Sequence, residues 1–111
     1  MTYDQDLAAR IRELVRDEAT LTEQKMFGGI AFLIGGNLAV SASGQGGLMV
    51  RVDPATSDEL IATTPAHLVE MHGRPMRGWL RVGTEHLRTQ RELAEWVALG
   101  MTYARSLPAK P

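Results

Sequence analysis

The sequence predicts an α+β fold, a two-layer sandwich in which helices cover one face of an antiparallel sheet. Three observations predict this class. The stretch from Lys25 to Val52 holds three apolar runs separated by two glycine-rich breaks, which is typical of consecutive antiparallel strands. Apolar residues recur at helical spacing near both ends of the chain. The 111 residues, 44% of them hydrophobic, suffice for a single domain, residues 1–111, ordered over about 3–107.

The first element expected is a helix over residues 3–19. Its inward side is one apolar stripe formed by Leu7, Ile11, Leu14 and Val15. Thr2 and Gln5 have the spacing of a capping box, and Asp4 is a competing start signal. We therefore expect this helix to cover a sheet and to leave its charged residues in solvent.

Three strands are expected next, at residues 27–34, 38–43 and 48–52. Glycine and asparagine in the turns between them tolerate the positive φ of tight hairpins. Alternation places Leu38, Val40 and Ala42 on one face of the second strand. The first strand is apolar on both faces, so it needs cover on both or a central place. Gly28 and Gly29 within it indicate a bulge or a close backbone approach.

The second half of the chain continues with a helix, two strands and a final helix. Asp53 is a good N-cap and Pro54 is tolerated in a first turn, which predicts a helix over residues 54–62. The two strands are expected at residues 66–72 and 76–82. Thr89 and Glu92 form a capping box, so the last helix begins near residue 90. The predicted order is α-β-β-β-α-β-β-α.

Composition excludes several classes of protein. The chain has no cysteine, hence no disulfide and no cysteine zinc site, which is consistent with the cytoplasm. No apolar run reaches the roughly 20 residues of a membrane span. The net charge of −1 does not favour nucleic acid as a partner. His67, His72 and His86 do not form a metal-binding pattern, so no metal or cofactor is expected.

Arginine and tryptophan residues give the most interesting candidate site. Alternation places Arg77, Trp79 and Arg81 on one face of the last strand, and Arg51 on the same face of a neighbouring strand. If helices leave that face open, it becomes an interaction face for a protein partner or a second copy. Two alternatives remain: arginine stems that merely cover Trp79 on a solvated sheet, or single-stranded nucleic acid stacked on the ring.

A second candidate is a loop cleft for a small ligand or an enzymatic reaction, beside Gly28 and Gly29 or Gly73 and Arg74. The glycine-rich breaks match no phosphate-binding motif and are better explained as hairpin turns. No residue set has the arrangement of a nucleophile, a base and an orienting acid. We therefore expect no catalytic residues and no enzymatic activity.

Several local motifs resemble the N-terminal domain of the TfoX/Sxy competence-regulator family. The motifs are Lys25-Met26-Phe27-Gly28-Gly29, the strand end Arg51-Val52-Asp53, the turn Gly73-Arg74-Pro75-Met76, and Leu93-x-x-Trp96 at the start of the last helix. The resemblance covers about residues 5–106. It implies a fold of the secretion-chaperone-like type and a role linked to switching on competence genes. Full-length regulators of the family carry a second, C-terminal helical domain, which is not expected in this chain.

Together these observations predict a non-catalytic protein-interaction or regulatory domain that works through protein contacts, as a homodimer in the cytoplasm. The first alternative is a transcription-linked module that contacts nucleic acid. The second, less favoured alternative is a small-ligand binder or an enzyme.

Overall fold

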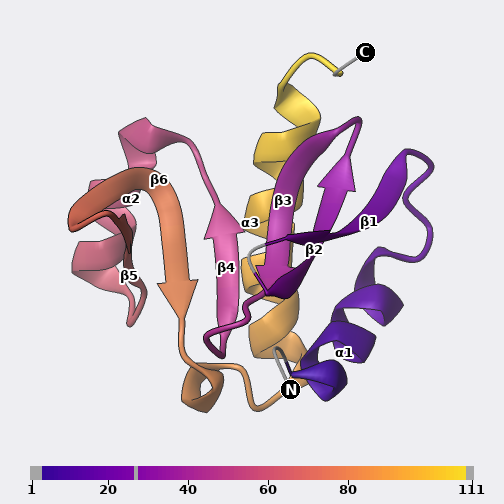
Figure 1. Cartoon of the computed structure of the whole chain (residues 1–111), viewed down its shortest axis with the longest axis horizontal. Helices are drawn as coiled ribbons and strands as arrows, with labels where there is room; N and C mark the ends of the chain where they lie inside the picture. Colours follow the sequence, from indigo (N-terminus) through magenta and orange to yellow (C-terminus); the bar gives the residue numbers. More distant parts are fainter. Residues whose placement is uncertain (1–3, 27, 110–111) are drawn as a thin grey trace.

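The computed structural model describes residues 4–26 and 28–109. Within these residues, three α-helices, a short 3-10 helix and six strands follow one another (Figure 1). In chain order they are α1 (Gln5–Val15), β1 (Leu21–Met26), β2 (Gly29–Ile34), β3 (Asn37–Ala42), β4 (Leu48–Arg51), α2 (Pro54–Thr63), β5 (His67–Met71), β6 (Arg74–Val82), η1 (Thr84–His86) and α3 (Gln90–Ser106).

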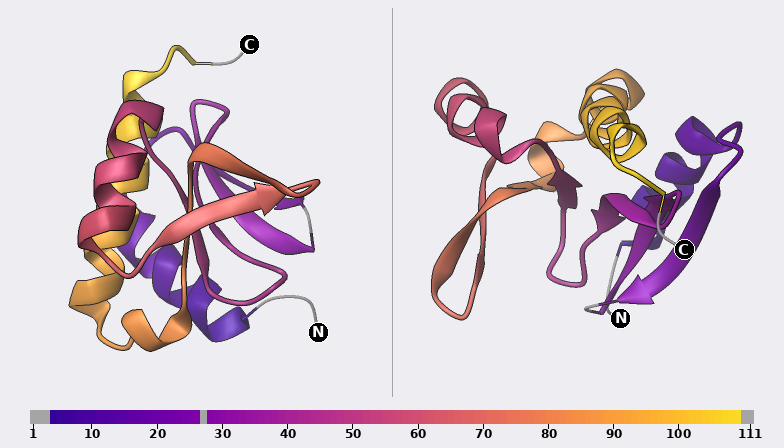
Figure 2. Two further views of the ribbon diagram at one scale, coloured as in Figure 1. Left: turned by 90° about the vertical axis from the view of Figure 1, so that its left-hand side faces the viewer. Right: turned by 90° about the horizontal axis from the view of Figure 1, so that it is seen from above.

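The strands form one antiparallel sheet in the order β1-β2-β3-β4-β6-β5. All three α-helices lie on the same side of this sheet (Figure 2). The α+β class with an antiparallel sheet is therefore confirmed. The boundaries of α2 and α3 also agree with the sequence, because Asp53 caps α2 and the Thr89–Glu92 capping box starts α3.

β1 was not predicted from the sequence. Four strands, β1 to β4, therefore lie between α1 and α2 where three were expected. β1 is an edge strand that, among the described strands, pairs only with β2, and residues 22–25 on it are exposed. A strand that buries little carries no strong apolar alternation, and hydrophobic periodicity does not reveal it. The helix before it is correspondingly shorter than expected and ends at Val15. Asp4 caps this helix through Leu7 N–H at 3.0 Å, whereas Thr2 lies outside the described residues.

The main core lies between the helices and the sheet. α3 packs along β3 and β4 with α1 beside it, and α2 packs on β6 and β5 instead. Phe32 of β2 is fully buried there, with the apolar stripes of α1 and α3 around it. β2 is buried along its whole length, as a strand apolar on both faces requires. Phe27, expected as its first residue, lies outside the described residues.

A bulge in β3 changes which side chains face the helices. Leu33 pairs with Leu38 and Phe32 pairs with Val40, which leaves Ala39 as an extra residue. Ala39 and Val40 both join the main core, while Leu38 packs on the opposite face. The expectation that Leu38 shares a face with Val40 and Ala42 is therefore wrong, because a bulge resets the alternation.

The face without helices has its own small apolar cluster. Its buried members are Ala31, Leu33, Leu38, Met49 and Val69, and Met26 and Trp79 pack against them. The two ends of the sheet, β1 and the β5–β6 hairpin, bend away from the helices and make this face concave (Figure 2). Curvature and these two flanking side chains thus cover apolar residues that no helix reaches.

Candidate functional site

The predicted interaction face is divided by the bend in β6. Leu68 pairs with Leu80 but Val69 pairs with Met76, so residues 77–79 form a wide irregularity, with Gly78 at φ +87°. Arg77 turns toward α2, where its guanidinium donates to the Pro54 carbonyl at 3.3 Å and to Asp58 Oδ2 at 3.2 Å. The expectation that Arg77 shares a face with Trp79 and Arg81 is wrong because positive φ at Gly78 interrupts the alternation.

Arg51 and Trp79 do lie together. Arg51 pairs with Trp79 across β4 and β6, and its guanidinium carbon is 5.1 Å from the centroid of the Trp79 ring. The same carbon is 5.6 Å from the Tyr103 ring of α3. Tyr103 can reach it because β3 pairs with β4 only as far as Val50, so the sheet opens beside Arg51. Two cation–π contacts therefore fix this guanidinium where the sheet opens.

Arg81 has a local structural role. Its guanidinium donates to Ser43 Oγ at 2.9 Å and to the Gly46 carbonyl at 3.2 Å, both in the connection between β3 and β4. These hydrogen bonds tie the connection to β6. Of the four residues proposed from the sequence, only Arg51 and Trp79 are brought into direct contact.

The residues of the predicted loop cleft belong to two different hairpins at opposite ends of the strand order. Gly28 (φ +77°) precedes β2, and a Cβ at Gly29 would collide with the Ala42 carbonyl oxygen, so the predicted close approach is present. Gly73 (φ +76°) lies in the β5–β6 turn with Arg74 directly after it. Among residues 4–26 and 28–109, no three histidine or carboxylate side chains gather in a way that could hold a metal ion.

A concave groove lies between α2 and α3. One hollow of about 410 Å³ and another of about 310 Å³ share Leu60, Glu95 and Leu99 in their walls. The first continues past Val52 and Tyr103 toward the end of α3. The groove exists because α2 is anchored to the β5–β6 hairpin rather than to α3, and Figure 2 shows the two helices set apart above the sheet.

Leu99 is the notable residue of this groove. Its side chain is 40% exposed, and it is the exposed large hydrophobic residue in the described part of the chain. It falls outside the inward stripe of α3, which consists of Leu93, Trp96, Val97, Gly100, Met101 and Ala104. An apolar residue outside the inward stripe of α3 was therefore the feature of the sequence that could have indicated this groove.

The charged residues of the groove walls are acidic except for His86. Asp53, Glu92 and Glu95 line the two hollows, and among the residues that the structure describes no lysine or arginine does. The hydrogen bond from the Thr89 backbone N–H to Glu92 Oε1 holds the pKa of Glu92 below its usual value, and the same carboxylate completes the cap of α3. Glu95 lies 4.0 Å from Arg91, both well exposed, which is a weak pairing. The groove therefore has apolar walls and a net negative rim.

Fold and groove together define a small α+β domain with a groove between two helices on one side of an open sheet. Residues 13–104 match the family of the TfoX N-terminal domain, and the chain belongs to this family. It is thus a competence-regulator-like domain. A search of curated proteins found no match to the chain. No helix in the described part combines the length and apolar character needed to cross a bilayer.

Proposed function

We propose that this chain is a non-catalytic regulatory domain of the cytoplasm that acts through protein contacts, as a homodimer, in the control of competence genes. Its docking surface is the groove between α2 and α3. The observation that carries this proposal is the exposed Leu99 in a largely apolar groove between α2 and α3. Mostly apolar hollows of a few hundred Å³ with a small number of polar groups in their walls are the usual form of a binding site.

The occupant of the groove is an amphipathic helix from a partner protein, with basic residues beside its apolar stripe. Apolar side chains of such a helix would enter the two hollows that meet at Leu60 and Leu99. Its lysine or arginine residues would lie near Glu95 and Asp53, since the charged side chains among the described lining residues are acidic apart from His86. Charge complementarity of this kind determines the choice of partner more than the affinity.

A binding role fits the acidic groups better than a catalytic one. The Asp53 carboxylate accepts from Ala55 N–H at 2.9 Å and holds the start of α2, and Glu92 holds the start of α3. Nucleic acid as a partner has less support, because Arg77 is paired with Asp58 and Arg81 is bound to the β3–β4 connection.

A peptide probe tests the proposal. The probe is a fluorescent helical peptide of about four turns with a leucine stripe and flanking lysines, and its matched control carries glutamates instead of lysines. We expect the lysine peptide to bind at least about tenfold more tightly, a difference of roughly 1.4 kcal/mol. Leu99→Lys should abolish binding, while Ala62→Lys on the exposed side of α2 should not. Equal binding of both peptides, or binding unaffected by Leu99→Lys, would contradict the proposal.

A further inference from the structure

Within residues 4–26 and 28–109, no strand pairs with the outer edge of β1. β1 ends the strand order and pairs only with β2, and Thr22, Glu23, Gln24 and Lys25 are all exposed. An edge of this kind offers unpaired backbone N–H and C=O groups to another strand. The strand has six residues and lacks proline, so neither extreme shortness nor proline prevents such pairing.

The hydrogen bonds of the β1–β2 ladder show which residues turn those groups outward. Gly35 N–H donates to the Thr20 carbonyl at 3.3 Å, one step beyond the Leu21–Ile34 pair. In an antiparallel ladder, hydrogen-bonded pairs alternate with pairs that are not hydrogen-bonded. Thr22 and Gln24 therefore direct their backbone groups to β2, while Leu21, Glu23 and Lys25 direct theirs to the free edge.

We propose that a second copy of this chain pairs with this edge, antiparallel and two-fold symmetric, with Gln24 opposite Gln24 of the other copy. Residues with outward backbone groups must face each other, which leaves the registers centred on Thr22, Glu23, Gln24 or Lys25. The register centred on Thr22 opposes Leu21 to Glu23 and forms no charge pair. The register centred on Glu23 opposes two glutamates, and the one centred on Lys25 opposes two lysines. Only the register centred on Gln24 places each Glu23 opposite a Lys25, giving two opposite-charge pairs.

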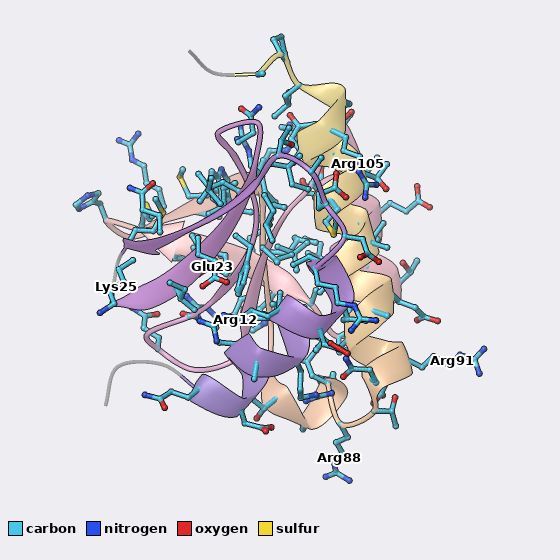
Figure 3. The ribbon with its side chains drawn as sticks, turned by 90° about the vertical axis from the view of Figure 1, so that its right-hand side faces the viewer. Arg12, Glu23, Lys25, Arg88, Arg91 and Arg105 are labelled. Carbon is cyan, nitrogen blue, oxygen red and sulfur yellow. The ribbon has the colours of Figure 1, made fainter. Side chains whose placement is uncertain are left out.

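The surrounding side chains suit this register. Glu23 and Lys25 extend on the helix side of β1, since their partners Phe32 and Ile30 belong to the main core. Glu23 Oε2 accepts from Arg12 Nε at 2.8 Å, and Figure 3 shows Glu23 and Arg12 together with Lys25 at the same edge. No carboxylate in the described residues lies within ion-pair distance of Lys25. Charged residues ordinarily prevent edge pairing, but here their order Glu-Gln-Lys is self-complementary.

This inference rests on the self-association in the proposed function but is independent of the groove. α2 and α3 border the groove, and α2 sits over β5 and β6 at the far end of the strand order from β1. Loss of the dimer in a β1 variant should therefore leave binding of the lysine peptide unchanged. The two proposals can fail separately.

Charge exchange tests the register. We expect the full chain to be dimeric in analytical ultracentrifugation. Glu23→Lys and Lys25→Glu should each weaken the dimer at least about tenfold, because each puts like charges opposite in both pairs. A mixture of the two variants should dimerise again, since both lysines of the first variant would then face glutamates of the second. Lys25→Glu keeps the Arg12–Glu23 ion pair, so at a dilution where both proteins are monomeric its thermal unfolding should stay close to that of the original chain.

Cysteine cross-linking tests the two-fold centre directly. The chain has no cysteine, so Gln24→Cys introduces the only thiol. Directly opposed residues in a pair that is not hydrogen-bonded have Cα atoms about 4.5 Å apart, within the range of a disulfide. Gln24→Cys should form a covalent dimer under mild oxidation, and Thr22→Cys, which the register places opposite Met26 and away from its own copy, should not. A monomeric chain, equal cross-linking of both variants, or a dimer insensitive to both charge changes would overturn the proposal.

Discussion

Gly100→Ala should destabilise the domain although alanine is the better helix former. The exchange gains about 1 kcal/mol of helix propensity in the interior of α3. A Cβ at position 100 would, however, collide with the Ala39 carbonyl oxygen and approach Val40 Cγ1 to 2.8 Å. Overpacking of a buried contact costs about 1–3 kcal/mol. The upper end applies because the obstacle is backbone in the β3 bulge, so we expect a net loss of about 1–2 kcal/mol.

Urea unfolding followed by far-UV circular dichroism measures this loss. With a slope of about 1–3 kcal/mol per molar urea for a small domain, the midpoint should fall by roughly 0.3–2 M. Thr102→Ala is the matched control, because it raises propensity at an exposed position of the same helix. That variant should keep or slightly raise the midpoint. A higher midpoint for Gly100→Ala would show that α3 does not press on the bulge and would refute the packing described here.

Three further outcomes are expected from the same measurement. Trp96→Ala should cost about 3–5 kcal/mol, because its buried ring joins α3 to the core; an unchanged midpoint would contradict its burial. Gly28→Val should cost at least about 1–2 kcal/mol, since residue 28 has φ +77°, which L side chains rarely adopt. An unchanged midpoint would show that the turn tolerates valine without strain. The hydrogen bond from Arg105 lowers the pKa of Glu18, and Thr89 lowers that of Glu92, so both contribute stability above their unfolded pKa values. That contribution to the free energy of unfolding should disappear as the pH falls through the folded pKa values. Glu18→Gln should therefore make the free energy of unfolding less dependent on pH. Identical pH profiles for this variant and the original chain would exclude the Arg105 contact.

Elements with local signals were predictable. The starts of α2 and α3 follow from Asp53 and from the Thr89–Glu92 capping box, which depend only on neighbouring residues. The central strands follow from apolar runs long enough to require burial. β1 was not predictable in this way, because an exposed edge strand is defined by its pairing with β2 and not by its own periodicity.

The candidate site was predictable only in part. Arg51 and Trp79 were placed together correctly, because β4 and β6 are regular where they pair. The predicted face of Arg77 was wrong because the irregularity at Gly78 interrupts the alternation of side chains between the two faces of the sheet. No local sequence pattern indicates such a register change. The groove depends on the distance between two helices, so Leu99 could be noted as unusual but not assigned to a surface.

The bent hairpin links fold and function. Because β6 turns at Gly78, the β5–β6 hairpin leaves the plane of the other strands and carries α2 away from α3. The groove is therefore a consequence of the sheet, and its width is held by the contacts of Arg77 with α2 and of Gly78 with Val52. Pairing through β1 would join two such sheets at the opposite edge and leave both grooves unobstructed. A partner with two basic amphipathic segments would then bind the dimer with an effective concentration set by its linker, which a single domain does not offer. Dimerisation and partner capture would thus reinforce each other without sharing a residue.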